Sequence, residues 1–114
     1  MLTMEKLQAY GAKTDEGLKR CLGNEGMYLR LIGMAVEDGN FAKLEEAIRS
    51  GDVDSAFNAA HALKGALGNL ALEPLFAPVS ELTELLRRKT PGNCEGLLKT
   101  VLEQRAALRK LTED

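Results

Sequence analysis

The sequence of 114 residues has no tryptophan, one histidine and two cysteines, and aromatic residues make up only 4% of it. No apolar run approaches the ~20 residues of a membrane-spanning helix, and the N-terminus lacks the basic and apolar segments of a signal peptide. Cys21 and Cys94 are far apart and have no Cys-x-x-Cys spacing, so they predict buried free thiols rather than a zinc site. We therefore expect a cytoplasmic protein with no membrane segment.

An excess of charge of one sign is also lacking. The 15 basic and 17 acidic side chains are intermixed and give a net charge of −2, so we expect no nucleic-acid partner. There is no Gly-rich phosphate loop and no Walker pattern, so we expect no kinase or ATPase activity of the chain's own. One histidine and scattered carboxylates predict no metal site and no bound cofactor.

Leucine and alanine are abundant, β-branched residues are few, and hydrophobic residues make up 45% of the chain, which favours an all-α fold. We predict one domain over residues 1–114, with one or two short helices within residues 1–22 packed over one end of a bundle. The bundle, residues 24–112, is predicted to be an antiparallel up-down four-helix bundle.

The first leg of the bundle, residues 24–50, is interpreted as a single helix that can kink at Gly39-Asn40. An apolar face keeps its phase across this interruption. The predicted core residues on that face are Met27, Leu31, Met34, Phe41, Leu44 and Ile48.

Turn and cap signals separate the legs. Gly51 suits the end of the first leg and Asp52 suits the N-cap of the second. Pro74 suits the first turn of the third leg, and Pro78 removes one more backbone donor, so we expect an irregular start there. The segment Thr90-Pro91-Gly92 predicts the turn before the last leg.

The second leg, residues 53–70, carries the only histidine of the chain. At about 100° per residue, His61, Gly65 and Gly68 share a stripe that is turned away from the apolar seam of this helix. Lys64, at i+3 from His61, can reach the space over the imidazole ring. The apolar seam consists of Val53, Ala56, Ala60, Leu63, Leu67 and Leu70.

This arrangement favours nucleophilic chemistry at His61. A neutral imidazole offers a free nitrogen lone pair, and a neighbouring cation suits an anionic electrophile such as a phosphoryl group. We therefore predict that His61 is a phosphoacceptor and that Lys64 stabilises the charge of the phosphoryl group.

Each glycine inside a helix costs about 1 kcal/mol relative to alanine, so two glycines on the face of the only histidine indicate a role for the bare backbone. We predict that Gly65 and Gly68 allow a large, flat partner surface to approach the imidazole ring closely. Close helix packing is the alternative role for Gly65 and Gly68, and their position away from the leucine seam argues against it. Phe57 and Asn58 are a candidate docking surface, although Phe57 is equally compatible with the core.

The run AHALKG from Ala60 to Gly65, followed by Gly68-Asn69-Leu70, resembles the signature of histidine-containing phosphotransfer (HPt) domains. The segment TDEGLKRCLGNEGMYLRLI, the Gly51-Asp52 break and SELTELLR from Ser80 to Arg87 are similar to the same family pattern. The resemblance covers nearly the whole chain. Ala71 departs from it, since the family commonly has glycine there, and this concerns the shape of the helix end rather than the chemistry.

The resemblance implies a carrier in a two-component phosphorelay. His61 would accept a phosphoryl group, at Nε2, from the aspartyl phosphate of one response-regulator receiver domain and pass it to the aspartate of another. The receiver would supply Mg²⁺, and the partners can include a hybrid histidine kinase. We expect a monomer, and we expect it to stand alone because the chain begins with Met and ends soon after its last helix.

Other interpretations stay open. One is the phosphoacceptor domain of a hybrid or chemotaxis-type histidine kinase, which a kinase catalytic domain phosphorylates directly. Another is a helical adaptor that binds receiver domains and carries no phosphate. A metal-binding helical bundle is a distant third, because the chain lacks the Glu-x-x-His pairs of such sites.

Overall fold

The computed structural model describes residues 1–89 and 92–113, and within these residues it contains seven α-helices and no strand. The helices are α1 (Met4–Tyr10), α2 (Thr14–Arg20), α3 (Glu25–Val36), α4 (Asn40–Ser50), α5 (Val53–Asn69), α6 (Glu73–Arg87) and α7 (Cys94–Glu113).

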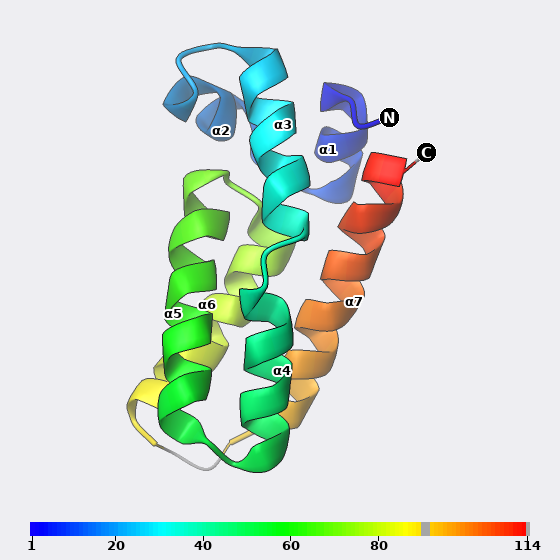
Figure 1. The fold of residues 1–114 in the computed structure, drawn as a ribbon. Coiled ribbons are helices and arrows are strands. Elements are labelled where there is room, and N and C mark those ends of the chain that lie inside the picture. The colour runs from blue at the N-terminus through cyan, green and yellow to red at the C-terminus, as the bar shows by residue number, and fades with distance from the viewer. Residues whose placement is uncertain (90–91, 114) are drawn as a thin grey trace.

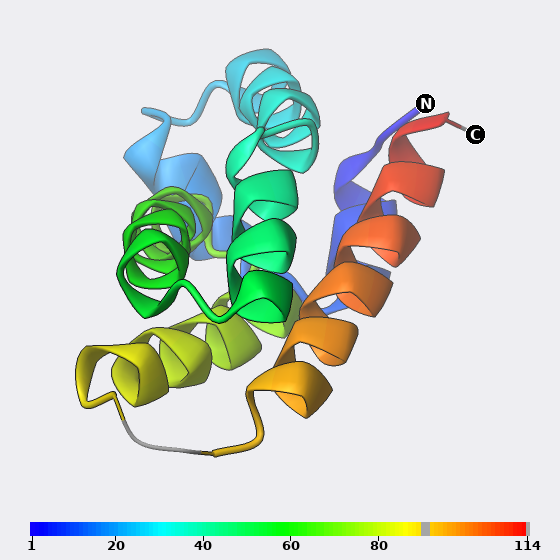
Figure 2. The same ribbon diagram turned by 60° about the horizontal axis from the view of Figure 1, so that its bottom comes forward.

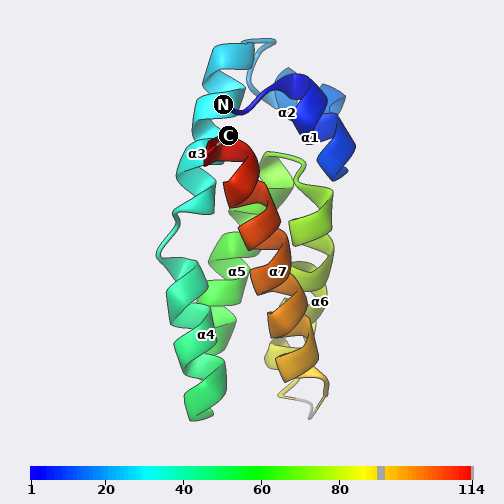
Figure 3. The same cartoon turned by 90° about the vertical axis from the view of Figure 1, so that its right-hand side faces the viewer.

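The predicted all-α bundle is confirmed. Helices α4 to α7 run alternately up and down, and α3 continues the line of α4 at the end of the bundle where the two termini meet (Figure 1). Viewed along the bundle, α5 lies between α4 and α6, and α7 closes the bundle on the other side (Figure 2). The short helices α1 and α2 cover the end that holds the last turn of α5 (Figure 3).

The first leg of the bundle is two helices, so the interpretation of residues 24–50 as a single helix is wrong. Helix α3 ends at Val36, and α4 begins only at Asn40. The physical reason is a local side-chain hydrogen bond, in which Asp38 Oδ1 accepts the backbone N–H of Asn40 at 2.8 Å in place of a helical carbonyl. From α7, Arg105 Nε donates to the freed carbonyl oxygen of Val36 at 2.8 Å.

The break also changes which face of α3 is buried. Met27 and Met34, predicted as core, are 42% and 63% exposed, whereas Tyr28, Ile32 and Val36 are fully buried. Residues 28, 32 and 36 form a second apolar stripe beside the predicted one. Because α3 and α4 are separate helices, the phase of α4 does not determine the buried face of α3.

The core predictions for the next two helices hold with two exceptions, Ile48 of α4, which is half-buried, and Val53 of α5. Phe41 and Leu44 of α4 are buried, and so is the predicted seam of α5 after its first residue, namely Ala56, Ala60, Leu63, Leu67 and Leu70. Val53 is 37% exposed because it is the first residue of α5 and lies at the open end of the bundle.

The turn and cap signals are largely confirmed. Gly51 ends α4 with φ of +79°, and Pro74 lies in the first turn of α6. Pro78 is buried inside α6, which continues unbroken to Arg87, so the irregular start predicted there is wrong; the missing N–H removes only one hydrogen bond. Of the predicted turn at residues 90–92, Thr90 and Pro91 lie outside the described residues. Both thiols are free, with Cys21 buried and Cys94 half-buried.

Candidate functional site

Asp52 is the N-cap of α5, as predicted. Its carboxylate accepts the Ser55 hydroxyl at 2.8 Å and the Ser55 backbone N–H at 3.1 Å. The side-chain hydrogen bond first, and the backbone one second, hold the pKa of the Asp52 carboxyl below its ordinary value. The resulting negative charge at the helix N-terminus fixes where α5 begins.

The C-terminal end of α5 is a Schellman motif that contains an alanine. The N–H of Leu72 donates to the carbonyl oxygen of Leu67, and that of Ala71 donates to Gly68, each at 3.1 Å. Ala71 has φ of +56°, a left-handed conformation that costs a non-glycine residue about 1–2 kcal/mol. The helix end therefore has the shape that glycine favours, although alanine occupies the position.

Two residues from the N-terminal part of the chain donate hydrogen bonds to this end of α5. The hydroxyl of Tyr28 donates to the carbonyl oxygen of Leu70 at 2.8 Å in a buried hydrogen bond, and the backbone N–H of Lys13 donates to the carbonyl oxygen of Ala71 at 2.9 Å. Burial raises the pKa of the Tyr28 hydroxyl, with a smaller contribution from Cys21. The hydroxyl therefore stays protonated and continues to donate.

His61 is exposed on the outer face of α5, and the outward orientation predicted for it is confirmed. Its imidazole is stacked on the Phe57 ring, with 5.6 Å between ring centroids and 15° between planes. The guanidinium group of Arg87, from α6, lies over the Phe57 ring, with its central carbon 5.1 Å from the ring centroid. Phe57 is half-buried and packs against the core, so it holds the imidazole between the core and solvent.

Lys64 and Gly65 lie together with His61 in an open depression of about 730 Å³. Lys64 is half-buried, and among the described residues no carboxylate lies within salt-bridge distance of its ammonium group. A Cβ at Gly65 would meet nothing within 4 Å, so this glycine leaves the surface beside the imidazole open.

Gly68 has a packing role that the sequence interpretation argued against. A Cβ there would lie 2.8 Å from Cε1 of Phe76 in α6, which is closer than two carbon atoms can approach. Gly68 therefore allows α6 to pack against α5, and it also lines the depression beside His61. Its use as access for a partner remains a prediction.

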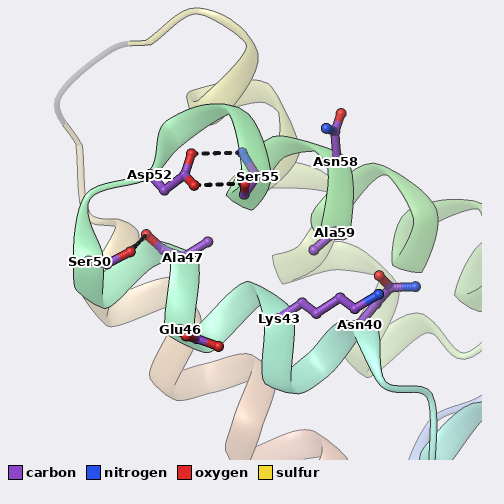
Figure 4. Close-up of a pocket in the computed structure, with 9 residues that line it drawn as sticks. All are labelled: Asn40, Lys43, Glu46, Ala47, Ser50, Asp52, Ser55, Asn58 and Ala59. Carbon is purple, nitrogen blue, oxygen red and sulfur yellow. Dashed lines mark hydrogen bonds between the residues drawn. The ribbon is translucent and has the colours of Figure 1, made fainter.

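Asn58 lies at the edge of a different hollow, a polar groove of about 430 Å³ between α4 and α5. Figure 4 shows Ala59 of α5 pointing toward Lys43 and Asn40 of α4, whereas the Asn58 amide points away from them. The groove contains only two carboxylates, and Asp52 already binds Ser55. Among residues 1–89 and 92–113, no three histidine, cysteine, aspartate or glutamate side chains cluster closely enough to hold a metal ion.

Sequence reasoning missed three residues at the site. Arg87 and Phe76 come from α6, and Arg20 comes from α2; Arg20 and Phe76 line the depression, and Arg87 covers Phe57. The i to i+4 spacing of Phe57 and His61 could have indicated their stacking. No local pattern relates Arg20 or Phe76 to His61, because both contacts depend on tertiary packing.

Comparison with known protein families indicates which family the chain belongs to. The family model described as the Hpt domain matches residues 37–112, which is two thirds of the chain and includes α4 to α6 and nearly all of α7. The chain belongs to the HPt domain family. No curated protein and no solved structure matched the chain.

As an HPt domain, the protein is a histidine phosphotransfer module of two-component phosphorelays, a class of domain that interacts with receiver domains and histidine kinases. The match begins at Glu37, so α1 to α3 of this HPt domain lie outside it. No helix in the described part of the chain is both long enough and apolar enough to cross a lipid bilayer.

Proposed function

We propose that this HPt domain carries a phosphoryl group on His61 between the aspartates of two receiver domains. The observation that supports the proposal most strongly is the placement of the only histidine. His61 is exposed on α5 and lines one depression with Lys64 and the bare backbone of Gly65, in a chain that matches the HPt family.

In the proposed transfer, the lone pair of His61 Nε2 forms a bond to phosphorus while the bond from phosphorus to the aspartate oxygen of the donor breaks. The donor carboxylate leaves with the bonding electron pair. Return transfer is the same exchange with the aspartate of the second receiver as the nucleophile. The ammonium group of Lys64 stabilises the negative oxygens of the phosphoryl group at each stage.

The proposal divides the chemistry between the partners. The receiver brings Mg²⁺ and the acyl phosphate, and this protein brings the nucleophile, one cation and an open surface. ATP is not a substrate of the proposed carrier. We propose that the carrier is a monomer, since each transfer step needs only one receiver. We also propose that it acts in the cytoplasm.

A two-receiver assay tests the carrier role. One receiver domain from the same organism is phosphorylated on its aspartate, separated from its phosphodonor and mixed with a second, unphosphorylated receiver in Mg²⁺. Wild-type protein should speed the appearance of label on the second receiver, and His61→Gln should not, although it folds and still binds the donor. Equal activity of His61→Gln would contradict the carrier role and favour an adaptor.

A further inference from the structure

Arg20 is the last residue of α2 and lies outside the segment that matches the HPt family model. Its guanidinium Nη1 donates to the carbonyl oxygen of Gly68, 48 residues further along the chain. A cation at the C-terminal end of a helix is favoured by the helix dipole, and this hydrogen bond holds the guanidinium at the last turn of α5.

The depression beside His61 is therefore cationic at both ends. Lys64 follows His61 by three residues on α5, Arg20 lies at the carbonyl oxygen of Gly68, and the residues that line the depression include no carboxylate. Gly65 and Gly68 line the same depression, and the Phe76 ring packs against Gly68. A partner surface that covers His61 at close range therefore also comes close to Arg20.

Arg20 binds α5 at Gly68, which is too far from His61 along α5 for its guanidinium to act on the phosphoryl group itself. Gly68 follows His61 by seven residues, which is about 10 Å along the axis at 1.5 Å per residue. A guanidinium at that distance can instead bind a group on the partner. The guanidinium has five N–H donors in a planar fork, and the described residues place no carboxylate within salt-bridge distance of it.

The chemistry of the donor indicates what that group is. Mg²⁺ is held by carboxylates, so a surface that carries an aspartyl phosphate and Mg²⁺ has acidic residues around its reacting centre. We propose that Arg20 is a docking residue that binds a carboxylate of the receiver beside this centre and so speeds association. The inference rests on the proposed carrier function, which it extends by assigning a contact of the partner.

The experiment compares two phosphodonors on the full chain. A phosphorylated receiver domain from the same organism must dock before it reacts, whereas phosphoramidate is a small donor with no protein surface. Labelling rates are measured for wild type, Arg20→Gln, Arg20→Lys and Lys19→Gln, at increasing receiver concentration and at low and high salt. Lys19→Gln is the matched control because Lys19 is an exposed cation of the same helix that does not line the depression.

We expect Arg20→Gln to lower the second-order rate constant with the receiver about tenfold at low salt, with little change in the saturated rate and a smaller effect at high salt. Arg20→Lys should keep part of the rate, and Lys19→Gln should behave as wild type. All four proteins should be labelled by phosphoramidate at the same rate.

Two results would overturn the docking role while leaving the carrier function intact. The first is that Arg20→Gln equals wild type with the receiver. The second is that Arg20→Gln is slow with both donors, which would show that Arg20 acts through the shape of the α5 end. Wild-type protein that accepts label from phosphoramidate and from no receiver would overturn the carrier function, and the docking role with it.

Discussion

The His61 imidazole is stacked on the Phe57 ring, with ring centroids 5.6 Å apart and planes 15° apart. The two residues are one helical turn apart on α5, and Arg87 covers Phe57 at 5.1 Å. Stacking of this kind restricts rotation of the imidazole about its side-chain bonds. The nucleophile is thus exposed to solvent and still oriented by the core.

Replacing Phe57 by leucine should slow phosphorylation of His61 while leaving the fold intact. Leucine keeps apolar packing against the core but removes the stacked ring, an interaction worth about 0.5–1.5 kcal/mol. The expected loss is roughly three- to tenfold in the rate of labelling by phosphoramidate, measured together with the free energy of unfolding. A rate equal to that of wild type would show that stacking does not orient the nucleophile.

Lys64→Ala should lower the rate of phosphoryl transfer by about tenfold or more, because the ammonium group no longer stabilises the phosphoryl oxygens. Lys64→Arg keeps the positive charge and should keep most of the rate. Lys43→Ala is the control, since Lys43 is an exposed lysine in the groove between α4 and α5. An unchanged rate in Lys64→Ala would remove Lys64 from the mechanism.

The two glycines of the depression should respond differently to alanine. Gly65→Ala should raise the free energy of unfolding by up to ~1 kcal/mol, since the new methyl group meets nothing and alanine favours helix. Gly68→Ala should lower it by about 1–3 kcal/mol, because the methyl group would overlap Phe76. Denaturant unfolding of both variants measures the difference.

Gly65→Ala should nevertheless slow transfer from a receiver, because the methyl group occupies the surface that the partner approaches. Gly33→Ala is the matched control, a helical glycine of α3 whose Cβ would also meet nothing within 4 Å. It should give a similar gain in stability with no loss of transfer. Equal transfer rates in the two variants would contradict the access role of Gly65.

Tyr28→Phe should lower the free energy of unfolding by about 1–2 kcal/mol, because it leaves the buried carbonyl oxygen of Leu70 without its hydroxyl donor. Tyr10→Phe is the comparison, since the Tyr10 hydroxyl donates to Gln104 in a part-buried position, where water can replace it. A smaller effect at Tyr28 than at Tyr10 would show that the α5 end does not depend on this contact.

The sequence was informative where one helix decides the outcome. The periodicity of α5 placed His61 outward with Lys64 and Gly65 beside it, and Asp52 marked where the helix begins. These features depend on helix geometry and on local hydrogen bonds, which a single segment of sequence determines.

The sequence was misleading where the outcome depends on contacts between helices. Met27 and Met34 belong to an apolar stripe of α3, but the break after Val36 lets α3 bury its other stripe. Gly68 was predicted to give a partner access, but the Phe76 ring of the next helix packs against it. Arg20 reaches the α5 end only because α2 folds over the bundle, which no local pattern indicates.

The central claim is that His61 is the phosphoacceptor, and direct labelling tests it. The purified protein is incubated with a receiver domain from the same organism that has been phosphorylated on its aspartate in Mg²⁺, beside a His61→Gln control whose folding is verified by circular dichroism. Label on the wild type alone, labile in acid and stable in base, is the predicted result. Label that persists in His61→Gln, or no label from any receiver on folded wild type, would contradict the claim.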